Sequence, residues 1–254
     1  MYLLGGLLFF CLAYVSVGLA GVAVNAKTTK PCLSWGLHFS AEGQPPSPPM
    51  DSKKLRDLGG LYLVDGRCIC LTFDAGFENG HTADILDTLQ KRNVKATFFL
   101  TGHYVRENAP LVKRMLAEGH LVGNHTENHP DMARLDSFES FAHELEEFEK
   151  TFFAATGRPL TKLYRPPGGK TSEPQLEYAK KLGYTTVFWS LAYVDWQQET
   201  QPSREYALGK LYPRMHEGAI LLLHSTSATN ASILDELIEH WQAEGYLFIL
   251  PSTQ

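Results

Sequence analysis

An aspartate stands at the end of the first strand-like run of the chain. Ile69–Phe73 is apolar and rich in β-forming residues, and Asp74 follows it directly, before a turn that contains Gly76 and Gly80. A carboxylate at the C-terminal end of a strand faces the open mouth of an α/β barrel, where the catalytic groups of such folds collect. Asp74 is therefore our first candidate for a catalytic residue. The alternative is an acid that only caps its own turn.

Two histidines, His125 and His129, stand four residues apart after a later strand-like run. On a helical turn, this spacing places two imidazoles on one face, where they can hold one metal ion. The pattern therefore predicts a metal site at the end of a strand. The alternative is a pair of surface histidines on a loop, because two ligands alone make a weak site.

A cation and two more titratable side chains end later strands. Arg165 precedes two prolines and two glycines, which fix its backbone, so its guanidinium can hold a carboxylate ionised. We expect Asp195 to be its partner. His224 ends the apolar run Ala219–Leu223, and a position facing Asp74 across the barrel mouth would suit a general acid. The alternatives are a surface arginine and a structural histidine.

Aromatic residues surround the second acid, with Trp189 before it and Trp196 directly after it. Rings suit a sugar groove because the C–H faces of sugars lie on them, yet a tryptophan in an apolar run more often belongs to the core. We therefore predict that Trp189 is a core residue and that Trp196 forms the wall of a groove.

The elements that must position these residues alternate between β-type runs and helical patterns. Helical periodicity is clear in residues 82–92 and 233–243. The predicted strands are Ile69–Phe73, Thr97–Thr101, Leu121–Asn124, Leu163–Arg165, Thr186–Ser190, Ile220–His224 and Tyr246–Leu250. Such β/α repeats with right-handed crossovers make a parallel sheet, closed or nearly closed.

The composition changes along the chain. Residues 1–26 carry no charged side chain, which indicates a signal peptide or a membrane anchor and therefore a domain that works outside the cytoplasm. Residues 27–66 are rich in Pro, Ser and Gly and predict an extended strap over the domain. Residues 67–254 would form the barrel. The four cysteines show no zinc-type spacing, so buried thiols are expected.

The formal net charge of −5 offers no basic field for a phosphate backbone, so nucleic acid is not an expected partner. A length of 254 residues suits one α/β domain. We expect a monomer that acts on a neutral or uncharged-polar substrate.

Five ordered motifs resemble those of the polysaccharide deacetylase (NodB-homology, carbohydrate esterase 4) family. They are Thr72-Phe73-Asp74, His125-x-x-x-His129-Pro130, Arg165-Pro166-Pro167, the aromatic segment that ends in Asp195-Trp196, and Leu222-Leu223-His224. The stretches 75–80, 101–104 and 189–191, with Trp35-Gly36 before the barrel, look closer still to the PdaA-type subgroup, the δ-lactam-biosynthetic (muramic acid) de-N-acetylases.

The resemblance implies a distorted (β/α)7 barrel of the NodB-homology type. It also implies removal of acetyl groups from N-acetylmuramic acid in peptidoglycan glycan strands whose stem peptides have been cut away. The freed amine would then close onto the lactyl carboxyl as the muramic δ-lactam of spore cortex. The implied roles are a base (Asp74), an acid (His224), metal ligands (His125, His129), a supporting charge network (Arg165, Asp195) and substrate contacts (Asn79, Gly168, Trp196).

Ala75 departs from the usual family pattern, in which a second acid follows the catalytic one and completes a metal site of one Asp and two His. A methyl group ligates nothing. The PdaA type lacks that acid, so Ala75 supports the subgroup and leaves open which divalent metal, Zn, Mn or Mg, is bound and whether one is needed.

Two other functions compete with this reading. The same chemistry would serve an N-acetylglucosamine deacetylase of peptidoglycan or chitin-like glycan. Ala75 would also suit a catalytically inactive sugar-binding module, although intact Asp74 and His224 favour an enzyme.

Overall fold

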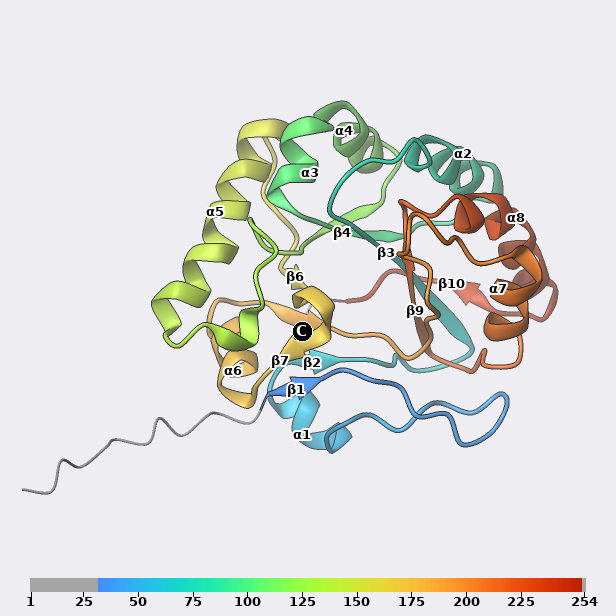
Figure 1. Ribbon diagram of the computed structural model, residues 1–254, viewed down its shortest axis with the longest axis horizontal. Coiled ribbons are helices and arrows are strands. Elements are labelled where there is room, and N and C mark those ends of the chain that lie inside the picture. The colour runs from blue at the N-terminus through green and yellow to red at the C-terminus, as the bar shows by residue number, and fades with distance from the viewer. Residues whose placement is uncertain (1–31, 253–254) are drawn as a thin grey trace, which may run out of the picture. The chain divides into compact units, whose positions relative to one another are not determined.

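A curled sheet of parallel strands lies at the centre of the fold and is wrapped by helices (Figure 1). The computed structural model describes residues 32–252, which fall in one compact unit. The strands of the large sheet are β2 (Gly60–Leu61), β3 (Cys68–Ala75), β4 (Thr97–Leu100), β5 (Leu121–Asn124), β6 (Leu163–Tyr164), β8 (Thr185–Val187), β9 (Ala219–His224) and β10 (Leu247–Phe248). The helices are α1 (Ser52–Asp57), α2 (Thr82–Arg92), α3 (Gly102–Glu107), α4 (Ala109–Ala117), α5 (Phe138–Thr156), α6 (Glu173–Lys181), α7 (Arg204–Leu211) and α8 (Ala228–Ala243).

The sheet runs in the order β10-β3-β4-β5-β6-β8-β2, and β9 also pairs with β3. It closes where the chain after β8 reaches β9. There Leu191 forms a parallel bridge with Leu221, and the Leu222 N–H donates to the Leu191 carbonyl at 2.9 Å. Because the chain after β8 pairs with β9 only through an isolated bridge and not along a full strand, the barrel is distorted rather than regular. The fold class predicted from the sequence is thus confirmed.

Strand β3 has two different faces because side chains alternate along a strand. Phe73 and Ala75 belong to the apolar core that lies between the sheet and the helices. Cys70 packs instead with the residues inside the barrel. Asp74 shares the face of Cys70 and stands near the C-terminal end of the strand, so the alternation directs its carboxylate into the barrel mouth.

Helices α2 and α8 cover β3 and are fixed by specific ends. The predicted helix 82–92 is confirmed with the same bounds, and Asn93 ends it in the left-handed conformation (φ 52). The predicted helix 233–243 begins earlier, because the Ser227 side chain caps it by accepting from the Asn230 N–H.

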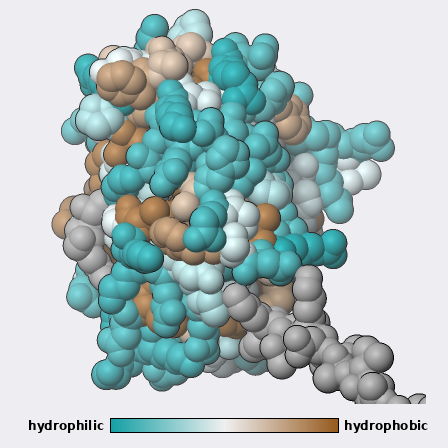
Figure 2. Space-filling view, turned by 90° about the vertical axis from the view of Figure 1, so that its left-hand side faces the viewer, coloured by the Kyte–Doolittle hydropathy of each residue, from teal (hydrophilic) through white to brown (hydrophobic). Residues whose placement is uncertain are grey.

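The face of the molecule over α5 and α6 is mostly hydrophilic, with apolar side chains in small patches (Figure 2).

The segment 27–66, predicted as a strap, contains regular elements where it is described. β1 (Leu33–Ser34) pairs with β7 (Lys170–Thr171), and β2 joins the large sheet beside β8. Trp35 stacks on Phe188 with 4.0 Å between ring centroids. The segment is therefore packed onto the barrel over much of its length.

The segment 1–26, predicted as a signal peptide or anchor, lies outside the described residues. Within residues 32–252, no helix is both long enough and apolar enough to cross a membrane. Cys68 and Cys70 are free and buried, as expected, whereas Cys32 is exposed.

Candidate active site

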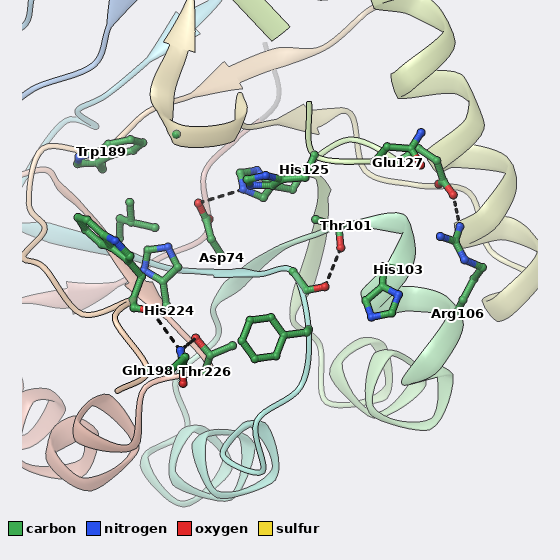
Figure 3. A pocket seen from close by; sticks show the side chains of 17 residues that line it. Asp74, Thr101, His103, Arg106, His125, Glu127, Trp189, Gln198, His224 and Thr226 are labelled. Atoms are coloured by element: carbon green, nitrogen blue, oxygen red, sulfur yellow. Dashed lines mark hydrogen bonds and ion pairs between the residues drawn. The ribbon is translucent and has the colours of Figure 1, made fainter. Parts of the chain in front are cut away.

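A pocket of about 870 Å³ opens at the C-terminal ends of the strands, a volume in the range of small-molecule sites. Figure 3 shows that Asp74 lies between His125 and His224 within it. The predicted site residues that line this pocket are Asp74, His125, His129, Gly168, Trp196 and His224.

Asp74 is held by Arg165, which is fully buried beneath it. The guanidinium Nη1 donates to Asp74 Oδ1 at 2.8 Å and to Thr72 Oγ1 at 2.9 Å, while Nε donates to the Val187 carbonyl at 3.0 Å. The guanidinium also lies over the Phe99 ring at 4.2 Å. Arg165 is thus fixed on several sides, and Asp74 keeps Oδ2 for the pocket.

The charge of Asp74 is set by two opposed effects. Burial by itself raises the pKa of the carboxyl, but the Arg165 guanidinium, followed by His125 and His224, outweighs burial and lowers that pKa below its ordinary value. Asp74 is therefore ionised at neutral pH.

Asp195 pairs with His224, so the prediction that Asp195 is the partner of Arg165 is wrong. Asp195 Oδ1 lies 2.7 Å from His224 Nδ1, and Oδ2 accepts from the His224 N–H at 2.8 Å and from Asn230 Nδ2 at 2.6 Å. The two acids and two cations form separate pairs because β3 and the chain after β8 bring each acid to a different neighbour. His224 Nε2 remains directed to the pocket.

The pKa of His224 follows from this pairing. Burial lowers it, but the charge of Asp195 and its hydrogen bond raise it above the ordinary value, with a further contribution from Asp74. The charge of Asp195 thereby stabilises the imidazolium form of His224 beside the pocket.

His125 is oriented by a backbone group. Its Nδ1 lies 2.8 Å from the Arg165 carbonyl oxygen, and because a carbonyl only accepts, Nδ1 carries a proton. Burial lowers the pKa of His125 to about 4, so the ring is neutral and Nε2 has a free lone pair. This Nε2 lies 3.7 Å from Asp74 Oδ2. Two facing acceptors at this separation suit a water molecule that donates a hydrogen bond to each.

His129 approaches His125 through a loop, so the predicted helical turn is wrong. The ring centroids are 5.0 Å apart, but Thr126 (φ 71) and His129 (φ 56) both have left-handed backbones. Thr126 Oγ1 accepts from the His129 N–H, and Asn124 Oδ1 accepts from the Thr126 N–H, each at 2.9 Å. Side-chain bonds of this kind to nearby backbone groups stabilise turns in place of a helix.

The residues present do not make a metal site with three protein ligands, the number used by catalytic zinc centres. Among residues 32–252, no group of three or more His, Cys, Asp or Glu side chains is placed to hold a metal ion. Asp74 Oδ1 is bound to Arg165, and the Ala75 methyl is buried in the apolar core. The assignment of His125 and His129 as metal ligands stays a prediction, and no chemical step below depends on a metal.

The pocket walls are aromatic on the side of the chain after β8. Trp196 is 53% exposed and lines the pocket, as predicted for a groove wall. Trp189, predicted as a core residue, is half-buried: it packs against a cluster of buried core residues and also lines the same pocket, so that prediction holds only in part.

Asn79, predicted to contact the substrate, is not among the pocket-lining residues. Its Nδ2 donates to Gln198 Oε1 at 2.6 Å and to the Thr226 carbonyl at 3.0 Å. Gln198 Nε2 in turn donates to Thr226 Oγ1 at 3.1 Å. Asn79 therefore ties together the loops that follow β3, β8 and β9, and direct substrate contact by Asn79 stays a prediction.

Several residues that line or support the pocket were not predicted as site residues from the sequence. Thr101 lines the pocket and donates to the Gly76 carbonyl at 3.1 Å, and its place at the end of a predicted strand could have indicated it. Glu127 lies between the two histidines in sequence and forms an ion pair with Arg106 on α3 (Figure 3). Asn230 donates a hydrogen bond to Asp195 from within α8, and no motif in the sequence indicated this role.

The arrangement can carry out hydrolysis of an acyl bond. An ionised carboxylate and an imidazole with a raised pKa share one pocket and come from adjacent strands. Such a pair can take a proton from water and return one to a leaving group, each transfer contributing roughly 10²- to 10⁴-fold in rate.

Comparison with known proteins also indicates an enzyme that hydrolyses an acyl bond, namely a deacetylase. A family model for polysaccharide deacetylases matches residues 63–187. The chain is also 40% identical over 240 residues to the peptidoglycan-N-acetylmuramic acid deacetylase PdaA of Bacillus subtilis, across 92% of this chain and 90% of that protein. The chain belongs to the polysaccharide deacetylase family and is an enzyme of that family.

One solved structure and one further relative support this assignment. The solved structure of Bacillus subtilis PdaA, a family 4 carbohydrate esterase, superposes with a TM-score of 0.81 at 39% identity, covering 85% of this chain and 94% of that one. A peptidoglycan-N-acetylglucosamine deacetylase of Bacillus cereus is 36% identical over 197 residues, across 73% of this chain and 87% of that protein. The fold is the NodB-type barrel, as predicted.

Proposed function

We propose that this enzyme works outside the cytoplasm and removes the acetyl group from N-acetylmuramic acid in peptidoglycan glycan strands freed of stem peptides. The observation that carries the proposal is the likeness to PdaA over nearly the whole of both chains. The joint presence of Asp74 and His224 in one pocket supports an active enzyme rather than an inactive sugar-binding module. An acetamide on a sugar ring is an uncharged-polar group, which suits the aromatic walls of this pocket.

In this reaction Asp74 acts as the base. Its free Oδ2, together with His125 Nε2, orients a water molecule by accepting a hydrogen bond from each of its O–H groups. The water oxygen forms a bond to the acetamide carbonyl carbon while one proton passes to Asp74. Because the pKa of Asp74 is lowered, the carboxylate is ionised at neutral pH but is a weak base, so the precise placement of the water is essential.

His224 acts as the acid. Asp195 holds Nδ1, so the Nε2–H of the imidazolium faces the pocket and passes its proton to the amide nitrogen as the C–N bond breaks. The products are acetate and a free amine on the sugar. Arg165 and Asp195 act through the residues they hold, since neither lines the pocket.

The product chemistry explains the cell-wall role that we propose. An amine on the muramic acid ring stands next to a lactyl group, and attack of the amine on the lactyl carboxyl gives a cyclic amide with loss of water. This is the muramic δ-lactam of spore cortex.

The competing function is deacetylation of N-acetylglucosamine, which the likeness to the Bacillus cereus enzyme favours. Mass spectrometry of muramidase-digested product separates the two. Loss of acetyl plus loss of water at muramic acid supports our proposal, and loss of acetyl at glucosamine without lactam contradicts it. No acetate from either glycan would support an inactive sugar-binding module.

A further inference from the structure

A second cavity, of about 410 Å³, adjoins the catalytic pocket and shares Trp189, Trp196 and Leu222 with it. The rest of its lining comes from the strap before the barrel, from the chain after β8, and from α7 and the residues that follow it. We define this second cavity as the strap cleft. Its lining residues take no part in the proton transfers described above.

The strap is anchored at both ends of this cleft. Trp35 Nε1 donates to the Trp189 carbonyl at 2.9 Å, beside the catalytic pocket. The Gly43 N–H donates to the Pro213 carbonyl at 2.9 Å, beyond the end of α7. Figure 1 shows the strap running under the barrel toward α7. The wall of the cleft is therefore a built part of the fold.

The walls of the cleft suit the ring faces of a sugar. Leu37 and Phe39 lie on the strap side and are half-buried, and Tyr206 on α7 is 48% exposed. Trp196 stands between the two cavities and is 53% exposed. Exposed aromatic rings can bind the apolar faces of sugars. A glycan in the catalytic pocket can thus continue into the strap cleft.

The cleft also carries a positive charge with no matching acid. Its only charged lining residues within the described chain are Lys210 and Arg214. Lys210 Nζ lies 5.1 Å from the centre of the Tyr206 ring, and the Arg214 guanidinium lies 4.7 Å from the centre of the Phe39 ring. Rings, and not carboxylates, hold these two cations in place. Each keeps its hydrogen-bond donors for an anionic ligand.

We propose that the strap cleft is a glycan subsite that binds a second, carboxylate-bearing sugar of the same strand, with Lys210 and Arg214 pairing with that carboxylate. The inference rests on the proposed function, in which the substrate is a peptide-free strand. Such a strand carries a free lactyl carboxylate on every second sugar, whereas a chitin-like glycan carries none. The cleft therefore favours peptide-stripped peptidoglycan over neutral glycans.

The test compares a peptide-free peptidoglycan oligosaccharide, long enough to fill both cavities, with the same oligosaccharide after reduction of its lactyl carboxyls to alcohols. The variants are Lys210→Gln, Arg214→Gln and the double substitution. A variant with Lys113→Gln and Arg158→Gln loses the same charge at exposed positions outside both cavities and serves as the matched control. Affinity for the labelled oligosaccharide and the kcat and KM of acetate release are measured.

We expect each single substitution to weaken affinity for the carboxylate form about fivefold and to raise KM in proportion, with kcat unchanged. The reduced oligosaccharide should bind the wild-type enzyme and the double variant equally. Equal affinity of the wild type for both oligosaccharides would overturn the subsite proposal. So would a loss of affinity in the control variant as large as that in the Lys210→Gln, Arg214→Gln double variant.

The binding measurement keeps this inference separate from the proposed function. If acetate came only from glucosamine, the proposed function would fail, yet carboxylate-dependent binding that needs Lys210 and Arg214 would still support the subsite. If muramic acid were deacetylated with no dependence on these cations, the proposed function would stand and the subsite would fall.

Discussion

Asp74 and His224 are paired positions on two adjacent parallel strands, β3 and β9. Neighbouring strands lie about 4.8 Å apart, so their backbones hold the two side chains beside each other at the barrel mouth. One register sets the spacing between the base and the acid, and both are on the rigid sheet rather than on loops. The convergence that the sequence motifs require is thus present in the fold.

Asp74→Asn should abolish most acetate release, with kcat reduced about 10²- to 10⁴-fold. The amide has nearly the same shape as the carboxylate but cannot accept a proton from water. The measurement is acetate release from peptide-free glycan, with circular dichroism to show an intact fold. As a matched control, Asp84→Asn changes an exposed acid on α2 and should leave the rate unaltered. Near-normal turnover by Asp74→Asn would rule out its role as base.

Asp195→Asn should move the alkaline limb of the pH–rate profile to lower pH. The active form has Asp74 ionised and His224 protonated, so activity falls as pH rises through the pKa of His224. Asp195 raises that pKa, and without its charge burial dominates and lowers it. The acid limb, set by the lowered pKa of Asp74, should stay in place.

A positioning control accompanies this pH measurement. Asn230→Ser removes a hydrogen bond to Asp195 Oδ2 but leaves the carboxylate charge next to His224. This variant should lower kcat with little shift of the alkaline limb. If both variants moved the limb equally, the raised pKa of His224 could not be attributed to the charge of Asp195.

Arg165→Leu should lower the free energy of unfolding by about 3–5 kcal/mol, because it leaves the buried Asp74 carboxylate without its partner. The double variant Arg165→Leu with Asp74→Asn should recover part of that loss, since no charge remains uncompensated. Urea unfolding of the wild type, both single variants and the double variant measures the coupling. Purely additive effects would contradict a direct interaction between the two side chains.

The predictable part of the fold was the part set by local pattern. Strand ends that carry polar residues identified Asp74, Arg165 and His224, because alternation and the barrel mouth together determine where such side chains go. The pairing of charges was not predictable in the same way. Whether Asp195 reaches Arg165 or His224 depends on the path of the chain after β8. That segment is neither helix nor strand, so no hydrophobic periodicity in the sequence predicts its path.

The histidine pair shows a second limit of sequence reasoning. Spacing predicted that His125 and His129 would meet, and they do, but through left-handed residues held by Asn124 and Thr126 instead of a helical turn. Trp189 was predicted to be core because its neighbours are apolar. The ring packs partly against the core and partly lines the pocket, and this division depends on tertiary packing that local sequence does not show.

Zinc should bind this enzyme weakly and only through the two histidines. Two protein ligands cannot approach the binding free energies of about 10–16 kcal/mol seen when zinc has four protein ligands. Calorimetric titration of the wild type with Zn²⁺ should therefore show a weak saturable site that dialysis empties. His125→Ala and His129→Ala should each abolish it, whereas His143→Ala, at an exposed position on α5, should not. Zinc that survived dialysis, or binding that persisted without His129, would show that the metal has another ligand set.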